Sequence, residues 1–114
     1  MEGIIYKKSF DFAVRIYRLY KYLKDDRKEL EIASQLLRCG TSIGANVSEA
    51  KNAPSKKDFK NKMNIALKEA RETEFWLRLL NEVGLLKDLQ YESIIIDCSE
   101  LIKILVSIIK SSQN

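Results

Sequence analysis

The sequence predicts an all-α protein that folds as one antiparallel, up-down-up-down four-helix bundle over residues 1–114. Three observations carry this prediction. The chain has only four glycines and one proline, so few breakers interrupt long helices. Its hydrophobic residues, 46% of the total, recur at helical spacing in four segments. Short connections join these segments, which makes consecutive helices pack antiparallel.

The first helix is expected over residues 9–24. Ser9 is placed as its N-cap, and Asp11 lies in the first turn, where a negative charge favours the positive end of the helix dipole. Apolar residues at 4-3-4 spacing give this helix a single core-facing stripe. The stripe consists of Phe12, Ile16, Leu19 and Leu23.

The second helix is expected over residues 30–51 and ends before Pro54, since the residue before a proline avoids the α region. Its interior glycines, Gly40 and Gly44, each cost about 1 kcal/mol relative to alanine. We therefore expect neighbouring helices to approach its backbone closely and to cover it on two sides. The core stripe consists of Ile32, Leu36, Gly40, Ile43, Val47 and Ala50.

The third helix is expected to start after Ser55, which can cap it, with Asp58 completing a pair like a capping box. Gly84 suits the position just after its end. The fourth helix is expected from residue 89 or 92 to residue 111. The two core stripes are Phe59, Met63, Ala66, Ala70, Leu77 and Leu80, and then Ile94, Cys98, Leu101, Leu105 and Ile108.

The fourth helix carries more apolar surface than one core face needs. Its apolar arc spans roughly 200°, whereas a core stripe takes little more than about 100°. Leaving three or four such side chains in water forgoes about 1.5–3 kcal/mol each. We therefore predict that further copies of the chain cover this surplus apolar surface. An aromatic residue of the third helix is predicted to belong to the same interface. The predicted oligomer interface comprises Ile95, Ile102, Ile104, Val106, Ile109 and Trp76.

A polar seam runs beside the core stripe of the second helix at 3-4-4-3 spacing. We interpret it as a buried hydrogen-bond network that fixes helix register or subunit pairing, and a ligand-binding groove is the alternative. Arg38 needs a carboxylate partner if it is buried. The candidate partners are Glu69, Glu72 and Asp97. The predicted members of the seam are Gln35, Arg38, Ser42, Asn46, Glu49, Glu69 and Glu72.

The formal charge of +4 is unevenly distributed along the chain. Residues 6–24 hold six Lys or Arg against one Asp, and residues 51–62 hold five Lys against one Asp. Such basic segments suggest an anionic partner, although a solvated lysine-rich surface is the plain alternative. Cations at helical spacing can follow phosphates, and aromatics such as Tyr22 and Phe75 can stack on bases. The predicted nucleic-acid-binding residues are Lys8, Arg15, Arg18, Lys57, Lys60, Lys68, Arg71 and Arg78.

Catalytic chemistry finds little support in the sequence. The chain has no histidine, which is the commonest general base and metal ligand. Gly40 and Gly44 lie inside a helix rather than in a phosphate-binding loop. We expect a non-enzymatic protein without catalytic residues, metal or cofactor, and an all-carboxylate metal site is the remaining alternative.

The two cysteines and the chain's hydropathy bear on its compartment. Cys39 and Cys98 fall within apolar helical patterns and are interpreted as core thiols, not as a disulfide. Residues 1–10 lack the apolar run of a signal peptide, and charges interrupt the fourth helix before it reaches the length of a membrane span. We expect a cytoplasmic protein with no membrane partner.

Three segments resemble the bacterial four-helix-bundle family whose members are encoded in intervening sequences of large-subunit ribosomal RNA genes. They read RCGTSIGANVSEA (38–50), SKKDF (55–59) and IALKEARETEFWLRLL (65–80), and the similarity runs from about residue 10 to 109. The chain departs mildly from this family at Cys39, where serine is frequent, and at Phe75, where tyrosine is frequent.

The resemblance implies a ring-shaped homo-oligomer, commonly a pentamer, in which the matching seam residues and Trp76 are architectural. The chain is similar also to the accessory variability determinant of diversity-generating retroelements, a basic pentameric bundle that works with a reverse transcriptase and its RNA. Neither resemblance implies a catalytic residue.

These observations leave three functional hypotheses. The leading one is an oligomeric scaffold that binds structured RNA, DNA or a nucleic-acid enzyme through its basic outer faces. The second is a protein–protein adaptor that acts through the apolar fourth helix or the rim of the ring. The third is a bundle that binds a small ligand or a metal in the polar seam.

Overall fold

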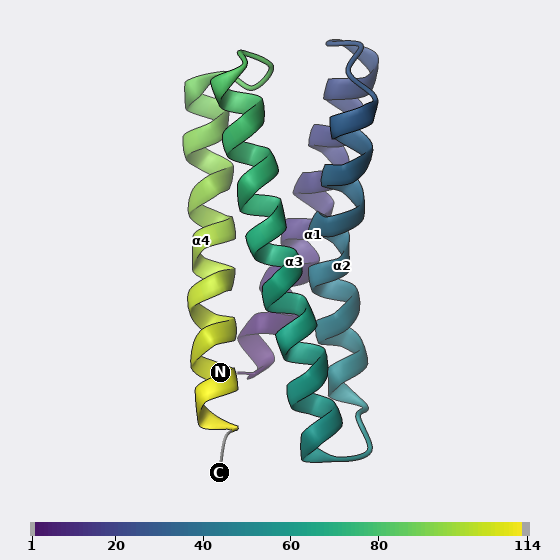
Figure 1. Cartoon of the computed structure of the whole chain (residues 1–114), viewed down its shortest axis with the longest axis vertical. Coiled ribbons are helices and arrows are strands. Elements are labelled where there is room, and N and C mark those ends of the chain that lie inside the picture. The colour runs from purple at the N-terminus through teal and green to yellow at the C-terminus, as the bar shows by residue number, and fades with distance from the viewer. Residues whose placement is uncertain (1, 113–114) are drawn as a thin grey trace.

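The computed structural model describes residues 2–112, which form four helices. These are α1 (Glu2–Asp25), α2 (Glu31–Lys51), α3 (Lys56–Glu82) and α4 (Asp88–Ser111). Consecutive helices run in opposite directions, so their connections alternate between the two ends of a bundle measuring 45 × 20 × 19 Å (Figure 1). Residues 2–112 contain no strand, which confirms the predicted all-α class.

The first helix begins seven residues earlier than predicted, and Ser9 is not its N-cap. Ser9 is buried within α1, where its hydroxyl donates to the carbonyl oxygen of Tyr6 at 3.2 Å. This local bond lets a serine lie among apolar neighbours without an unpaired polar atom. Ile5 is fully buried and extends the stripe of Phe12 and Ile16 toward the amino terminus. The serine therefore lies inside the helix and does not mark its start.

The ends of α3 follow the predicted capping pattern. Ser55 Oγ accepts from the backbone N–H of Asp58 at 3.1 Å and donates to Asp58 Oδ2 at 2.7 Å. Gly84 follows the C-cap with a φ of +80°, a left-handed conformation that glycine adopts without strain. At the start of α4, the side-chain oxygen of Gln90 accepts from the backbone N–H of Lys87 at 3.2 Å. These caps fix where the long helices begin and end.

Gly40 and Gly44 mark the closest approach between α1 and α2. A Cβ atom at Gly40 would lie 2.8 Å from Cγ1 of Ile16, and one at Gly44 would lie 3.1 Å from the carbonyl oxygen of Ser9. This confirms the expected close helix approach and explains why two unfavourable glycines occupy a helix interior. Both α1 and α3 pack on α2, as expected for a helix covered on two sides, and its remaining face, including Ala45, stays at the surface.

Both cysteines are buried as free thiols, which confirms their interpretation as core residues. Burial raises the pKa of the Cys39 thiol to about 11 and that of the Cys98 thiol to about 12. Thr73 is a buried polar residue that the apolar stripe did not include. Its hydroxyl donates to the carbonyl oxygen of Glu69 at 2.8 Å and lies 3.2 Å from Cys39 Sγ.

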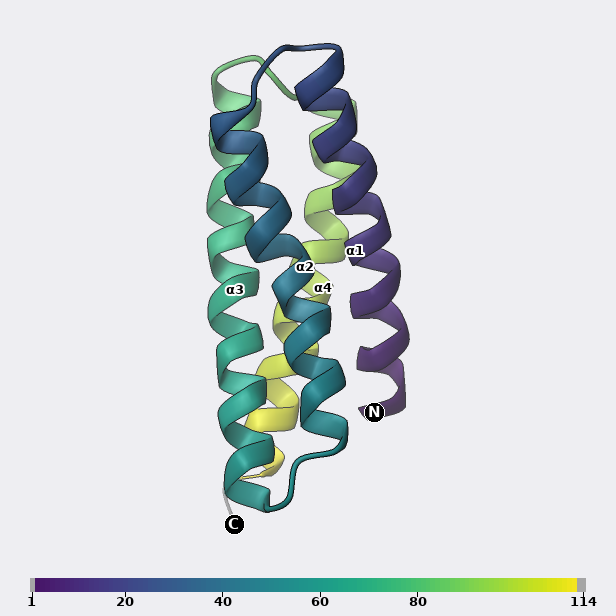
Figure 2. The same ribbon diagram turned by 90° about the vertical axis from the view of Figure 1, so that its right-hand side faces the viewer.

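Each helix packs on its sequence neighbours, and a narrower contact between α1 and α4 closes the bundle. Within residues 2–112, α1 and α3 make no close approach, and neither do α2 and α4, so each pair lies on a diagonal. Figure 2 shows the amino-terminal end of α1 apart from the carboxyl-terminal end of α4, and the Lys51 ammonium at the end of α2 lies 5.4 Å from the centre of the Tyr6 ring in α1. Two ion pairs join α1 to α4. Lys8 pairs with Glu100 at 3.0 Å, and Arg15 pairs with Asp97 at 2.6 Å.

Candidate nucleic-acid interface

Five of the predicted cations lie along the outer side of α3 and have no carboxylate within ion-pair distance among residues 2–112. Four of them are exposed and Lys60 is half-buried. They span about 31 Å of helix at 1.5 Å per residue. We call this set the α3 basic face; it consists of Lys57, Lys60, Lys68, Arg71 and Arg78.

The α3 basic face owes its position to the helical repeat. Buried residues such as Met63, Ala70 and Leu77 fix one side of α3 against the core, so the residues between them face solvent. Phe75 lies on this outer side with 57% of its surface exposed. The rings of Phe75 and Trp76 meet edge to face, with centroids 5.1 Å apart. An exposed aromatic ring among unpaired cations can both stack on a base and lie beside a phosphate.

The predicted cations of α1 have a different environment. Lys8 and Arg15 are held in the ion pairs with α4, and Arg15 also reaches the Ser93 hydroxyl at 3.0 Å. Arg18 is exposed and has no ion pair within the described residues. Since α1 and α3 lie on a diagonal of the bundle, the two predicted basic lines do not form one surface.

The polar seam lies at the surface where α2 meets α3, and not in the core as predicted. Arg38 binds Glu69 at 3.1 Å and also contacts Glu72, which confirms two of its three proposed partners. The third, Asp97, pairs with Arg15. The seam is exposed because α2 turns its small and apolar residues toward the core and leaves half of Arg38 in solvent.

The Arg38 cluster is held by one further donor. The indole N–H of Trp76 donates to Glu72 Oε2 at 3.0 Å, on the same carboxylate that Arg38 contacts. This hydrogen bond, and then the one from Arg38, lowers the pKa of the Glu72 carboxyl below its ordinary value. The hydrogen bond that Arg38 donates to Glu72 in turn raises the pKa of the Arg38 guanidinium. The cluster is therefore charged at neutral pH and links α2 firmly to α3.

The remaining seam residues do not join this cluster. Glu49 pairs with Lys62 at 2.7 Å, and the Asn46 side chain donates to the carbonyl oxygen of Ser42 at 2.8 Å within α2. Gln35 is exposed. The predicted continuous network is thus divided into separate local contacts.

The predicted oligomer interface on α4 is partly covered within one chain. Ile102 and Ile109 are only 9% and 8% exposed, because α4 contacts both α3 and α1 and so buries more than one stripe. The expectation that these two residues need another copy for burial is corrected accordingly. The other members are half-buried, and their place in an interface stays a prediction. They are Ile95, Ile104, Val106 and Trp76.

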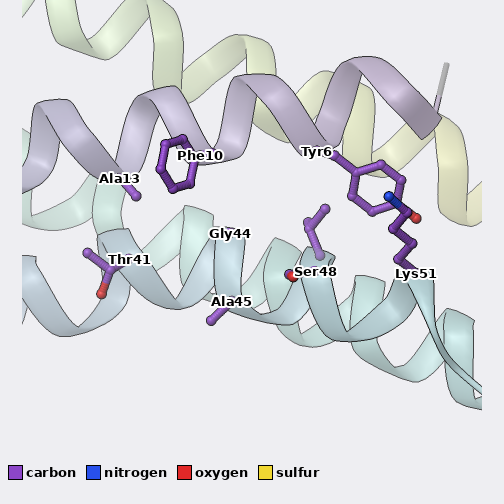
Figure 3. Close-up of a pocket in the computed structure, with 9 residues that line it drawn as sticks. Tyr6, Phe10, Ala13, Thr41, Gly44, Ala45, Ser48 and Lys51 are labelled. Carbon is purple, nitrogen blue, oxygen red and sulfur yellow. The ribbon is translucent and has the colours of Figure 1, made fainter.

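A groove between α1 and α2 was not foreseen from the sequence. It has a volume of about 360 Å³, and Phe10 and Ala13 line it from α1 while Ala45 and Ser48 line it from α2 (Figure 3). One end lies beside Lys51, whose ammonium sits 5.4 Å from the centre of the Tyr6 ring. The run of small residues on α2 was the available signal, because they leave space against a neighbouring helix.

Residues 2–112 show neither a cluster of metal-ligating side chains nor a membrane-spanning helix. No group of three or more Cys, Asp or Glu side chains is placed to hold a metal ion among the described residues. None of the helices in this part of the chain has the length and apolar content to cross a membrane.

Comparisons with known proteins agree with this fold. The model of the 23S rRNA-intervening sequence protein family matches residues 1–107. None of the curated proteins matches the chain. A crystal structure of a protein of unknown function from the S23 ribosomal protein family of Bacteroides thetaiotaomicron superposes with a TM-score of 0.94. That protein is 53% identical, and the match covers 96% of this chain and 97% of that one.

Proposed function

The chain belongs to the 23S rRNA-intervening sequence protein family, and on this premise we propose that it is a non-enzymatic accessory protein that binds structured RNA. The RNA contacts the α3 basic face. The absence of histidine from the sequence supports a role without catalysis. The protein acts in the cytoplasm, where free thiols such as Cys39 and Cys98 stay reduced.

The observation that carries this proposal is the lack of carboxylate partners on the α3 basic face within residues 2–112. Some other cations, Lys8, Arg15 and Arg38 among them, are held by acidic residues of neighbouring helices, whereas the α3 basic face brings five unpaired cations onto one side of one helix. An unpaired cation can release counterions from a phosphate without first breaking an internal ion pair. The α3 basic face is therefore the surface best suited to a polyanion.

Self-association strengthens the proposed binding. Several copies of the chain pack through half-buried α4 residues such as Ile95, Ile104 and Val106, in the ring of five that the family resemblance implies. Each copy then presents its own α3 basic face to one RNA, and linked weak contacts add up to tight binding. Light scattering coupled to size exclusion, with and without nuclease, measures the subunit count and any bound RNA. A monomer at all concentrations contradicts this part of the proposal.

The test of RNA binding is the salt dependence of affinity for a fluorescent RNA hairpin, measured by anisotropy. Five phosphate contacts in a duplex give a slope of about −4.5 in a plot of log K against log salt. Affinity then falls about 500-fold between 50 and 200 mM salt. The triple variant K57E/K68E/R71E abolishes binding but keeps the helical content and the oligomeric state.

A matched control separates this surface from overall charge. Lys87, Lys103 and Lys110 are exposed and have no ion pair among the described residues, so K87E/K103E/K110E changes the net charge equally from the side of α4. We expect this variant to bind the hairpin with little loss. Equal loss in both triple variants, affinity that ignores salt, or no binding by the native protein overturns the proposal.

A second candidate function is a protein–protein adaptor, which the exposed apolar residues favour. Leu89 is 82% exposed, Phe10 67% and Ile96 66%. Copurification of one defined protein from nuclease-treated lysate, and its loss in an F10S/I96S variant, supports this function instead. RNA binding that survives F10S/I96S favours the first proposal.

A further inference from the structure

A second hollow lies between α1 and α4, on the other side of α1 from the groove of Figure 3. Its volume is about 570 Å³, which falls in the size range of small-molecule sites. Apolar residues including Leu19 and Ile94 line its floor, and Arg18, Tyr22, Leu89 and Gln90 line its walls. The hollow therefore combines an apolar floor with charged, aromatic and amide groups in its walls.

The hollow exists because α1 and α4 are held apart. The α1–α4 contact is the narrowest in the bundle, and it is spanned by the long side chain of Arg15. The Arg15 guanidinium reaches Asp97 at 2.6 Å and the Ser93 hydroxyl at 3.0 Å. This bridge forms one wall of the hollow, which Arg15 and Ser93 line, and it pairs the Asp97 carboxylate.

Because Asp97 is already paired with Arg15, Arg18 is the cation of this hollow that is available to a ligand. Arg18 lies one turn from Arg15 on α1, is exposed, and has no ion pair within residues 2–112. Gln90 uses its side-chain oxygen to accept from the backbone N–H of Lys87, which leaves its amide nitrogen available to donate. Tyr22 is half-buried against the core, and the Leu89 side chain projects almost fully into solvent.

We propose that this hollow binds one unstacked nucleotide of a single-stranded RNA segment, with its phosphate on Arg18 and its base between Tyr22 and Leu89. This inference rests on the proposed RNA binding and names the form of RNA that is bound. A guanidinium beside an aromatic ring, an apolar wall and an amide donor matches the phosphate, the face and the polar edge of one nucleotide. Bases in a duplex stay stacked on their neighbours, so a duplex cannot place a single base in a hollow between two helices.

The α1–α4 hollow and the α3 basic face then contact different parts of the RNA. The basic face contacts phosphates of any RNA, whereas the hollow contacts a base and discriminates single strands from duplexes. Removing one charged hydrogen bond or one stacking contact weakens binding of a single strand by about tenfold. It leaves duplex binding unchanged.

The experiment uses the full chain, an eight-residue oligouridine and an RNA duplex of the same length. Anisotropy titrations compare the native protein with R18Q and L89A, both at exposed positions, and with R78Q on the α3 basic face as the matched control. We expect R18Q and L89A to weaken oligouridine binding about tenfold without changing duplex binding. R78Q should weaken both ligands to the same degree.

Photo-crosslinking locates the base directly. An oligouridine with one 4-thiouridine is irradiated with the native protein, and the modified peptides are identified by mass spectrometry. Adducts on Tyr22 or within residues 88–94 support the proposal. Adducts confined to α3, together with equal effects of R18Q on both ligands, overturn it while RNA binding itself stands. If neither ligand binds at all, the proposed function fails as well.

Discussion

The α-carbon of Gly40 rests directly against the side chain of Ile16, and this contact sets the distance between α2 and α1. A Cβ atom at position 40 would lie 2.8 Å from both Cγ1 and Cγ2 of Ile16. These are branch atoms beside the backbone, so rotation of the side-chain tip cannot relieve the overlap. The tight spacing thus requires glycine at position 40, as it does one turn further along α2 at Gly44.

Gly40→Ala is expected to destabilise the protein by up to about 2 kcal/mol, because overpacking costs about 1–3 kcal/mol and the gain in helix propensity returns about 1 kcal/mol of it. Urea unfolding followed by circular dichroism measures this change. Gly3→Ala is the control, since a Cβ there meets no atom within 4 Å. In an Ile16→Ala background the penalty of Gly40→Ala should vanish. A Gly40→Ala variant more stable than the native protein would contradict this packing.

The early start of α1 gives a prediction that rests on two adjacent isoleucines. Ile5 is fully buried, whereas Ile4 is 52% exposed. Ile5→Ala should cost about 2–5 kcal/mol of unfolding free energy, since it leaves a cavity in the core. Ile4→Ala should change stability by under about 0.5 kcal/mol, as a surface substitution does. Urea midpoints of the two variants measure the difference, and equal midpoints would show that the first two turns of α1 do not pack on the core.

The Glu72 carboxylate gives the protein a pH dependence with a definite sign. Its pKa is lowered in the folded chain, first by the Trp76 hydrogen bond and then by Arg38. The stabilisation is therefore present above the ordinary glutamate pKa of about 4.3 and is lost as pH falls through the lower folded value. Because Arg38 is half-exposed, this contribution is under about 1 kcal/mol.

Trp76 is the only tryptophan in the sequence, so its fluorescence reports on this hydrogen bond. We expect the emission of the folded protein to titrate with a midpoint below about 4.3. Glu72→Gln should remove this titration, whereas Glu69→Gln should preserve it. A midpoint at or above the ordinary value in the native protein would contradict the geometry.

The two thiols should react only when the protein unfolds. With pKa values of about 11 and about 12, Cys39 and Cys98 have almost no thiolate at pH 8, and both are buried. Alkylation by iodoacetamide, followed by mass spectrometry across a urea series, should track the unfolding transition at both sites. Rapid modification in native buffer would disprove their burial.

The same thiols predict lower stability at alkaline pH. Because their pKa is raised in the fold, the unfolded chain loses its thiol protons first, above about pH 8.5. Unfolding free energy should therefore fall as pH rises from 8 to 10. A Cys39→Ala/Cys98→Ala variant should show a weaker fall over this range, and an identical slope would exclude the thiols as its cause.

Helical periodicity predicted the four helices because their core residues recur every three or four positions. It failed at Ser9, since a hydroxyl that bonds to its own helix looks the same in sequence as a cap. It also misjudged Ile102 and Ile109, because the arc that α4 buries depends on the angle at which α1 and α3 meet it. Two of the three acidic partners proposed for Arg38 were correct, although they were inferred for a buried Arg38 and the structure leaves half of that side chain in solvent.

The candidate sites were less accessible to sequence reasoning. The cations of α3 and α1 look alike in sequence. Only the fold shows that Lys8 and Arg15 pair with acids of α4, while the α3 basic face has no ion pair within residues 2–112. Neither the α1–α2 groove nor the α1–α4 hollow follows from a motif, because both arise from the space between helices. Arg18 was selected for its charge, and its place beside Tyr22 and Leu89 required the structure.

The narrow α1–α4 contact also bears on the order in which the helices pack during folding. Within the described chain, these are the one touching pair of helices that no single connection joins, so bringing them together closes the longest loop. Helix pairs adjacent in sequence form quickly, because their contacts are local. We expect the docking of α1 against α4 to be the last step of folding and its release to be the first step of unfolding. Native-state hydrogen exchange should then be fastest along this edge of the bundle.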